Sequence, residues 1–327
     1  MIEKVRWGVL STAKIALAKV IPAMQRSPWC EITAIASRDL SKAQEAAREL
    51  NIAQAYGSYE ELLADPRVEA IYNPLPNNLH VAWTIKAAEA GKHVLCEKPI
   101  ALNAEEAKTL IDVRNRTGVK IQEAFMVRTH PQWIATRRLI KSGRIGALRS
   151  ITCFFSYFNP DPSNIRNQLE LGGGALMDIG CYPITISRFI YETEPRRVMA
   201  LIERDPAFGT DSLTTAVLDF PNGHSTFTCS TRLAPYQRMI FFGTEGRIEV
   251  LIPFNAPNDV PTQIIVDTET IEFPVCDQYE IQGSLFSQAI REKSEQPIPL
   301  EDAIKNMAVI DAVFRSATTG NWEETDT

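Results

Sequence analysis

The segment VRWGVLSTAKI, residues 5–15, decides the fold of the first part of the chain. Val5–Leu10 is a short apolar run typical of a buried strand, and Ile15–Met24 carries apolar residues at helical spacing. Residues 11–13 between them are small or polar and suit a tight turn. A strand that leads through a short turn into a helix is the opening unit of a parallel sheet. The segment therefore predicts an α/β domain.

Strand and helix patterns keep alternating up to about residue 122, which predicts a doubly wound parallel sheet over residues 1–122. The further strands are expected at Ile32–Ala36, Val68–Tyr72, His93–Cys96 and Val119–Gln122. The further helices are expected at Leu40–Leu50, from Ser58, at Leu79–Ala90 and from Asn103 to about Arg116.

The pattern changes after Glu123, which places a domain boundary near residue 122. Residues 123–327 are expected to form an α+β domain with a large, mostly antiparallel, open-faced sheet and helices on one face. Hairpins are predicted at Pro221–Gly223 and at Gly243–Gly246. Strands are predicted at Leu148–Phe158, Arg197–Glu203, Leu213–Phe220, His224–Ser230, Arg238–Phe242 and Arg247–Leu251, and helices at Pro131–Lys141, Tyr279–Lys293 and Leu300–Thr318.

Composition excludes several classes of function. A net charge of −6 over 327 residues argues against a general affinity for nucleic acid or for an anionic membrane. No apolar segment approaches the roughly 20 residues of a membrane helix. The six cysteines and four histidines show neither metal-ligand nor disulfide spacing, so no metal is expected. The opening MIEKVR leads directly into a strand, and a reduced cytoplasmic location is the simplest expectation.

The turn after the first strand is a candidate dinucleotide site. It begins at Gly8, and Ser11 and Ala13 stand where the full fingerprint carries glycine. Small residues still let the backbone approach a pyrophosphate, and the helix N-terminus still presents free N–H groups. An ordinary tight turn between strand and helix has the same features. The cofactor residues predicted here are Gly8, Ser11, Thr12, Ala13, Lys14 and Ile15.

The end of the second strand bears on the choice of cofactor. An NAD site usually has an acidic residue there, which bonds the ribose 2′-hydroxyl. This chain has Ser37 and Arg38 instead. A guanidinium can stack on adenine and pair with a 2′-phosphate. We therefore expect NADP to be preferred, with NAD possible; pairing of Arg38 with Asp39 alone is the alternative interpretation.

Two further strand ends carry candidate residues, because ligands of open α/β sheets bind beyond the carboxyl ends of the strands. The fourth strand pattern is followed by Asn73–Asn78, a loop stiffened by two prolines. Pro74, Leu75, Asn77 and His80 are assigned to the cofactor site here. Asn77 can bond the ribose or pyrophosphate, and His80 is expected to cap the following helix.

The strand His93–Cys96 is followed by Glu97-Lys98-Pro99, and both Glu97 and Lys98 are assigned to the cofactor site. A lysine at this corner can reach a bound cofactor and a substrate hydroxyl together.

Residues 172–182 hold the second catalytic candidate. Three glycines, Gly172–Gly174, precede Asp178 and Tyr182, which are four residues apart and share a face if the stretch is helical. Pro183 complicates this, because proline prefers the first helical turn and a helix starting there puts Asp178 in the lead-in. A plain glycine loop and a half-buried core tyrosine are the alternative interpretations.

In their order and spacing, these segments resemble the glucose–fructose oxidoreductase / inositol dehydrogenase family, the Gfo/Idh/MocA oxidoreductases. The resemblance implies a Rossmann domain, an open-faced α/β domain, and hydride transfer between a nicotinamide and a carbinol carbon. The sheet of the second domain often makes subunit contacts in this family, which implies a homodimer or homotetramer. With tyrosine at position 182, the sequence resembles the xylose and dihydrodiol dehydrogenase branch of the family most.

Carried over by position, Lys98 matches the family's catalytic lysine, and Asp178 and Tyr182 match its Asp-x-x-x-His/Tyr pair. Arg166 resembles a substrate-cleft position, with a surface charge as the alternative, and Tyr157 is expected to line the cleft, with Phe158 as the alternative. A lysine cation beside Tyr182 lowers the pKa of the phenol, so that Tyr182 works as base in oxidation and acid in reduction. The roles of Lys98 and Tyr182 can also be exchanged.

The sequence thus predicts an NADP-linked dehydrogenase or reductase acting on a sugar, polyol or cyclic diol. A non-catalytic dinucleotide sensor on the same fold and a reductase of a non-carbohydrate ligand are the alternatives. The presence of Lys98, Asp178 and Tyr182 together favours the enzyme. The expected partner is a small-molecule substrate, with no nucleic acid and no membrane.

Overall fold

The computed structural model describes residues 3–326, which divide into two compact units. The first combines the chain up to Met126 with the segment Asp277–Ala303. The second combines Val127–Cys276 with the chain from Ile304 onward. A cofactor role for the first unit and a substrate role for the second stay predictions.

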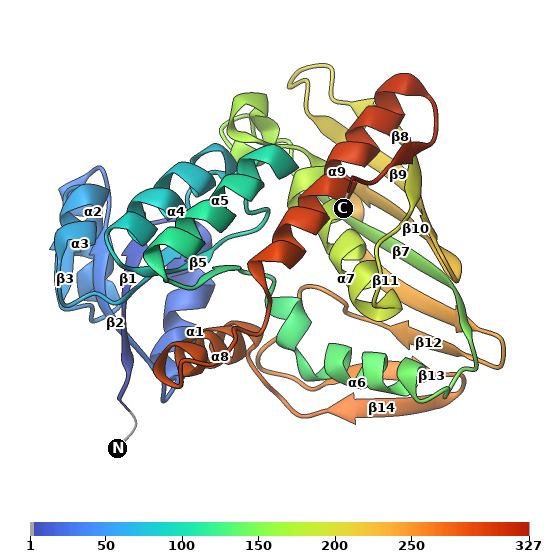
Figure 1. Ribbon diagram of the computed structural model, residues 1–327, viewed down its shortest axis with the longest axis horizontal. Coiled ribbons are helices and arrows are strands. Elements are labelled where there is room, and N and C mark those ends of the chain that lie inside the picture. The colour runs from blue at the N-terminus through green and yellow to red at the C-terminus, as the bar shows by residue number, and fades with distance from the viewer. Residues whose placement is uncertain (1–2, 327) are drawn as a thin grey trace. The chain divides into compact units, whose positions relative to one another are not determined.

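The first unit contains a six-stranded parallel sheet in the order β3-β2-β1-β4-β5-β6 (Figure 1). This is the strand order of the Rossmann fold, which confirms the predicted doubly wound sheet. The carboxyl ends of all six strands lie along one edge, which collects the loops that follow them. The strands are β1 (Val5–Leu10), β2 (Cys30–Ala36), β3 (Gln54–Tyr56), β4 (Ala70–Asn73), β5 (His93–Cys96) and β6 (Ile121–Glu123).

The connecting helices begin where the sequence supplies capping side chains. Asp39 accepts a hydrogen bond from Ser41 N, and Ser58 and Asn103 accept from the backbone N–H three residues on. Each bond satisfies a donor that the first helical turn leaves unpaired. The helices are α1 (Ile21–Arg26), α2 (Leu40–Glu49), α3 (Tyr59–Ala64), α4 (His80–Glu89) and α5 (Ala104–Thr117).

A helix from late in the chain, α8 (Gln278–Arg291), packs on the sheet of the first unit. The ring centroids of Trp7 and Phe286 are 5.8 Å apart, and Trp7 Nε1 donates to Ser287 Oγ at 3.0 Å. Arg291 also pairs with Glu69 at 2.7 Å. A single boundary near residue 122 therefore does not account for the segment Asp277–Ala303, which belongs to the first unit. Periodicity reveals a buried helical face, but it does not say which sheet the face covers.

The second unit contains a nine-stranded sheet in the order β14-β13-β12-β11-β7-β10-β9-β8-β15. Every pair is antiparallel except β7 with β10, which confirms the mostly antiparallel sheet. The sequence reading missed the hairpin of β13 and β14, which turns at Asp267 with φ 57°. The strands are β7 (Leu148–Phe158), β8 (Arg197–Arg204), β9 (Asp211–Phe220), β10 (Gly223–Ser230), β11 (Arg232–Gly243), β12 (Arg247–Val250), β13 (Thr262–Val266), β14 (Glu269–Phe273) and β15 (Glu323–Glu324).

Helices α6 (Pro131–Lys141) and α7 (Cys181–Tyr191) lie on one face of this sheet (Figure 1). Alternate strand residues such as Phe227 and Phe241 are fully buried in the core. Residues of the opposite alternation reach solvent, among them Leu201, which is 78% exposed. The last long helix, α9 (Leu300–Thr319), begins in the first unit and ends in the second.

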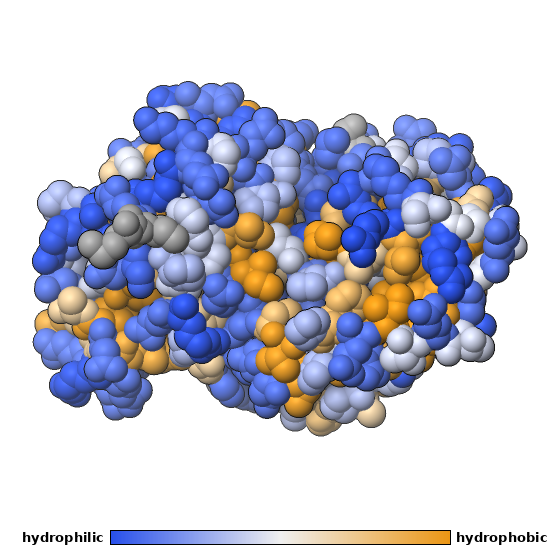
Figure 2. Space-filling view, turned by 90° about the horizontal axis from the view of Figure 1, so that it is seen from below, coloured by the Kyte–Doolittle hydropathy of each residue, from blue (hydrophilic) through white to orange (hydrophobic). Residues whose placement is uncertain are grey.

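In the view of Figure 2 the surface is mainly hydrophilic, and apolar residues reach it in separate groups. Over residues 3–326, every helix is too short or too polar to cross a membrane. Within the same residues, histidine, cysteine and acidic side chains form no cluster that could hold a metal ion.

The stability of the fold should fall in acid through its buried histidines. His93 and His130 each accept a backbone N–H at Nδ1, from Lys120 and Gln132. Burial lowers the pKa of both imidazoles to about 4. The unfolded chain therefore binds protons first as the pH falls below about 6.5, so the stability present at neutral pH is lost between about pH 6.5 and 4.

A variant of His130 isolates one of these contributions. His130→Asn keeps a side-chain acceptor at the start of α6 but does not titrate. Its free energy of unfolding in urea should drop less between about pH 7 and about pH 5 than that of the wild type, by about 2 kcal/mol. Parallel pH profiles for the two proteins would contradict this assignment.

Candidate active site

The turn after β1 holds Ser11 in a left-handed backbone conformation that usually favours glycine. Ser11 adopts φ 75°, its N–H donates to Ala36 O at 2.8 Å, and its Oγ accepts from Ala13 N at 3.2 Å. A helical stretch, residues 14–26, follows at once. Gly8 lies inside β1, where a Cβ would come within 2.6 Å of Leu62 Cδ2. Packing therefore accounts for Gly8, and the turn itself begins at Ser11.

The end of β2 opens into a hollow of about 420 Å³. Ser37 is buried and accepts from Asp39 N at 3.2 Å, whereas Arg38 is exposed. Asp39 caps α2, and it also accepts the hydroxyl of Ser41. Burial raises the pKa of Tyr59, and the nearby Arg38 cation opposes that rise. The hollow is lined by Arg38, Gly57, Ser58, Tyr59, Leu79 and Trp83, among others.

Sequence reasoning missed two aromatic residues of this hollow. The rings of Tyr59 and Trp83 meet edge to face with centroids 4.8 Å apart. A hollow lined by a guanidinium and aromatic rings, together with a small-residue turn, fits the adenosine end of a dinucleotide. The only sequence signal was their position, one on each of two helices that follow strands of the sheet.

The fully buried side chain of Asn73 stabilises the loop after β4 through hydrogen bonds. Its Nδ2 donates to His80 O at 3.1 Å and to Thr84 Oγ1 at 3.3 Å, and its Oδ1 accepts from Leu75 N. Pro74 and Leu75 are buried, and half-buried Asn77 begins a 3₁₀ turn. Asn77 is thus one of the half-buried residues of this loop, whereas Pro74 and Leu75 are enclosed.

The cofactor contact predicted for His80 stays a prediction, because no observation tests it. Its side chain is fully buried, with Nε2 2.7 Å from Leu75 O and Nδ1 2.7 Å from Pro99 O. The expectation that its ring caps the helix is wrong. Burial lowers the pKa of His80 to about 4, which favours a neutral ring with one N–H to donate. His80 therefore links the loops after β4 and β5.

Lys98 stands in the loop after β5, where it is half-buried. The preceding Glu97 accepts the hydroxyl of Tyr72 at 2.6 Å, and Glu123 accepts Ile100 N at 2.8 Å. Burial and the Glu97 carboxylate raise the pKa of Tyr72 well above its usual range. The Lys98–Pro99 peptide bond is cis. A buried hydrogen-bond framework thus surrounds the backbone that carries the lysine.

In the second unit three predicted residues meet at one carboxylate. Tyr157 donates its hydroxyl to Asp178 Oδ2 at 2.6 Å, and Arg166 Nε lies 2.8 Å from the same oxygen. The Asp178 side chain is 12% exposed and that of Arg166 41%. The carboxylate raises the pKa of Arg166 further above its usual range. The result is a charge-balanced cluster with a solvent-facing guanidinium, so Arg166 is more than an isolated surface charge.

Local backbone contacts explain how Arg166 and Asp178 come together. Asn164 Oδ1 accepts Arg166 N at 3.1 Å, and Asn167 Nδ2 donates to Asn159 O at 3.1 Å. Leu176–Gly180 then forms a π-helical turn that carries Asp178 and runs straight into α7. Pro183 lacks the N–H that an α-helix would use here. It therefore conflicts with a regular helix through Asp178 and Tyr182, as the sequence indicates. The π-helical turn before Pro183 accommodates the missing N–H, and π turns are frequent at functional sites.

Tyr182 follows on α7, where its side chain is 5% exposed. Its ring centroid lies 5.2 Å from that of Phe254 and 6.0 Å from that of Phe155. Phe155 and Phe254, whose ring centroids lie 4.7 Å apart, therefore both pack against the Tyr182 ring and restrict its orientation. The alternative interpretation was a half-buried core tyrosine, and Tyr182 is more deeply buried than that.

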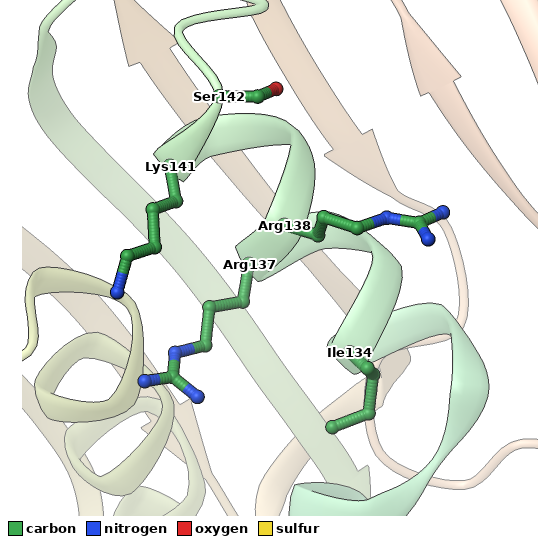
Figure 3. A pocket seen from close by; sticks show the side chains of 5 residues that line it. All are labelled: Ile134, Arg137, Arg138, Lys141 and Ser142. Atoms are coloured by element: carbon green, nitrogen blue, oxygen red, sulfur yellow. The ribbon is translucent and has the colours of Figure 1, made fainter.

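A different hollow, of about 410 Å³, lies along α6 (Figure 3). Arg137 and Lys141 both pair with Glu192, whereas Arg138 points away from them in Figure 3. Glu192 thus pairs with two of the three cations of the hollow, and the lining includes none of the predicted site residues.

Comparison with known proteins identifies the family. Residues 5–125 match the family model described as "Oxidoreductase family, NAD-binding Rossmann fold", and residues 133–249 match the GFO/IDH/MocA C-terminal domain. The chain belongs to the Gfo/Idh/MocA oxidoreductase family. The resemblance read from the sequence is confirmed, and the chain is an NAD(P)-dependent oxidoreductase acting on CH–OH groups.

The similar proteins span almost the whole chain. An uncharacterized oxidoreductase, ORF334, of Rhizobium meliloti is 49% identical over 98% of this chain and 99% of its own. The D-xylose 1-dehydrogenase (NADP(+)) 2 of Haloferax volcanii is 38% identical with the same coverage. A 3-ketoreductase from Actinomadura kijaniata, crystallised with NADP and TDP-benzene, superposes with a TM-score of 0.90 at 29% identity, covering 96% of this chain and 98% of the other.

Proposed function

We propose that this oxidoreductase uses NADP to oxidise or reduce a secondary alcohol or carbonyl of a sugar, polyol or cyclic diol. The observation that carries the proposal is the charge-balanced cluster of Tyr157, Arg166 and Asp178. A neutral pair that still offers hydrogen-bond donors and acceptors suits a hydroxylated, uncharged ligand. The D-xylose dehydrogenase among the similar proteins supports this substrate class.

Tyr182 and Lys98 supply the proton chemistry of the proposal. A bound nicotinamide would supply the hydride acceptor for oxidation and the hydride donor for reduction. In oxidation Tyr182 takes the hydroxyl proton, and in reduction it gives that proton back. The Lys98 cation favours the tyrosinate and polarises the reacting oxygen. Asp178 holds Arg166, which orients the substrate. In the alternative mechanism Lys98 transfers the proton in place of Tyr182, and variants of these two residues test both versions.

The cofactor preference rests on the end of β2. Ser37 and the exposed Arg38 stand where an acidic residue would repel a 2′-phosphate. The residues proposed to hold the cofactor are those at the turn after β1, Arg38, Asn77 and Lys98. The similar xylose dehydrogenase is an NADP(+) enzyme and the 3-ketoreductase was crystallised with NADP, which supports this preference.

We also propose that the open face of the nine-stranded sheet joins two or four copies of the chain. A row of side chains crosses the middle of that face by register, and none of them is charged. Neutral, β-branched and apolar side chains at the centre of a broad sheet are typical of a subunit interface. The row runs Met199, Val217, Thr226, Thr152 and Ile240.

Arg38→Ala tests the cofactor preference. Loss of a charged hydrogen bond to the 2′-phosphate should raise the KM for NADP by roughly 10- to 100-fold, while the KM for NAD changes less than about threefold. Steady-state kinetics with both cofactors measure this. Arg48→Ala, an exposed arginine on α2, is the control. Equal weakening of both cofactors would place Arg38 away from the phosphate.

Lys98→Ala and Tyr182→Phe test the proton chemistry. Each should lower turnover of a responsive sugar, polyol or diol by at least roughly 10²-fold, and Tyr182→Phe should leave cofactor affinity nearly unchanged. Turnover is read by NADPH absorbance and affinity by fluorescence titration. Tyr236→Phe, a tyrosine exposed on the sheet, is the matched control. A fully active Tyr182→Phe enzyme would remove that residue from proton transfer.

Val217→Glu tests the assembly. A charge buried at the centre of the row would cost several kcal/mol, so the variant should be monomeric where the wild type has at least twice the monomer mass by light scattering. Thr270→Glu, exposed on the edge strand β14, should leave the mass unchanged. A monomeric wild type would refute the interface.

A further inference from the structure

Asp211, the first residue of β9, is a buried carboxylate that the proposed chemistry leaves unused. Its side chain is almost fully enclosed, with 2% of the residue exposed. Oδ2 accepts Leu176 N at 2.6 Å and Thr214 Oγ1 at 3.1 Å. Burial raises the pKa of Asp211. Burial of a carboxyl group is costly unless the group is hydrogen-bonded, so these two bonds offset the cost of burying Asp211.

Leu176 opens the π turn that carries Asp178. Two residues earlier, Gly174 N donates to Arg166 O at 2.9 Å, and Gly174 O accepts Asp178 N at 3.1 Å. The side chains of Arg166 and Asp178 then meet at 2.8 Å. Gly174 therefore bonds both members of the ion pair through its two peptide groups. Its placement sets the backbone of both.

Asp211 also packs against Gly174 itself. A Cβ built on Gly174 would lie 1.9 Å from Asp211 Oδ1, and the glycine adopts φ +125°. Only glycine tolerates this combination of conformation and close approach. One oxygen of the carboxylate thus closes on Gly174 while the other binds Leu176. The segment between them, residues 174–176, is clamped against the start of β9.

We propose that Asp211 is a positioning residue, which acts through Gly174 and Leu176 to set the Arg166–Asp178 pair in the geometry that receives the substrate. The inference deepens the proposed function and rests on it for the role of that pair. It requires an acceptor oxygen at position 211, whether or not that oxygen is charged. Asparagine meets this requirement and alanine does not.

The first test compares Asp211→Ala with Asp211→Asn. In the alanine variant, amide hydrogen exchange of a peptide covering residues 172–182 should accelerate at least tenfold, and the KM for the carbinol substrate should rise at least tenfold. The dissociation constant of NADP should stay within twofold. Asp211→Asn should stay within threefold of the wild type in both exchange and KM.

A double variant distinguishes positioning of Asp178 by Asp211 from a general structural role of Asp211. If Asp211 acts through Asp178, then Asp211→Ala adds no further loss of kcat/KM in an Asp178→Asn background. A further loss of tenfold or more there would overturn the proposal. Should Asp211→Ala fail to fold, Gly174→Ala pushes the same carboxylate off Leu176 from the other side, and it should reproduce the faster exchange and the raised KM.

The exchange measurement also separates this inference from the proposed function. Faster exchange at residues 172–182 in a protein whose wild type turns over no carbinol supports the clamp and refutes the substrate assignment. Wild-type exchange and wild-type KM in Asp211→Ala, with an active parent enzyme, refute the clamp and leave the substrate assignment standing.

Discussion

One oxygen of Asp178 organises the second unit. It receives a phenol hydroxyl from strand β7 and a guanidinium N–H from the loop that follows that strand. Bonds to an ionised acceptor are shorter and stronger than those between neutral groups, so this oxygen holds two segments in a fixed relation to the start of α7. Because Tyr182 lies on the same continuous helical stretch, the orientation of the phenol is tied to the cluster.

The first unit achieves a similar precision by a different route. Parallel strands end at a common edge, so loops that are far apart in sequence are brought together by backbone pairing alone. Buried side chains then link neighbouring loops. His80 joins the loop after β4 to the one after β5, and Asn73 supports the first of these from within. The polar residues that reach solvent, such as Arg38 and Asn77, stand on loops whose backbone is already fixed.

The sequence was most informative where function requires a residue type at a strand end. Lys98 was identified in this way, whereas Asp178 and Tyr182 were identified from their spacing after three glycines and from the family resemblance. The alternation of strand and helix patterns predicted the parallel sheet, and most strands of the second sheet were also predicted. The predicted fold class is confirmed. The roles assigned to these residues remain predictions that kinetics must test.

The missed features share a physical reason. The meeting of Tyr157 with Asp178 joins residues twenty-one positions apart, and Asp211 reaches a backbone N–H thirty-five residues away. No local pattern encodes such contacts. His80 was expected to cap a helix, yet its ring nitrogens face two carbonyl oxygens instead. The packing of α8 on the first sheet likewise depends on which sheet has an apolar face left for a helix to bury, and this cannot be read from a local pattern.

Transfer of isotope from substrate to cofactor tests the central claim most directly. A polyol, sugar or cyclic diol deuterated at its carbinol carbon is incubated with the protein and NADP, and the nicotinamide product is examined by mass spectrometry. The account predicts that deuterium appears in NADPH and that deuteration slows kcat/KM. Tight binding of NADP with no deuterium transferred from any member of these three substrate classes would contradict it.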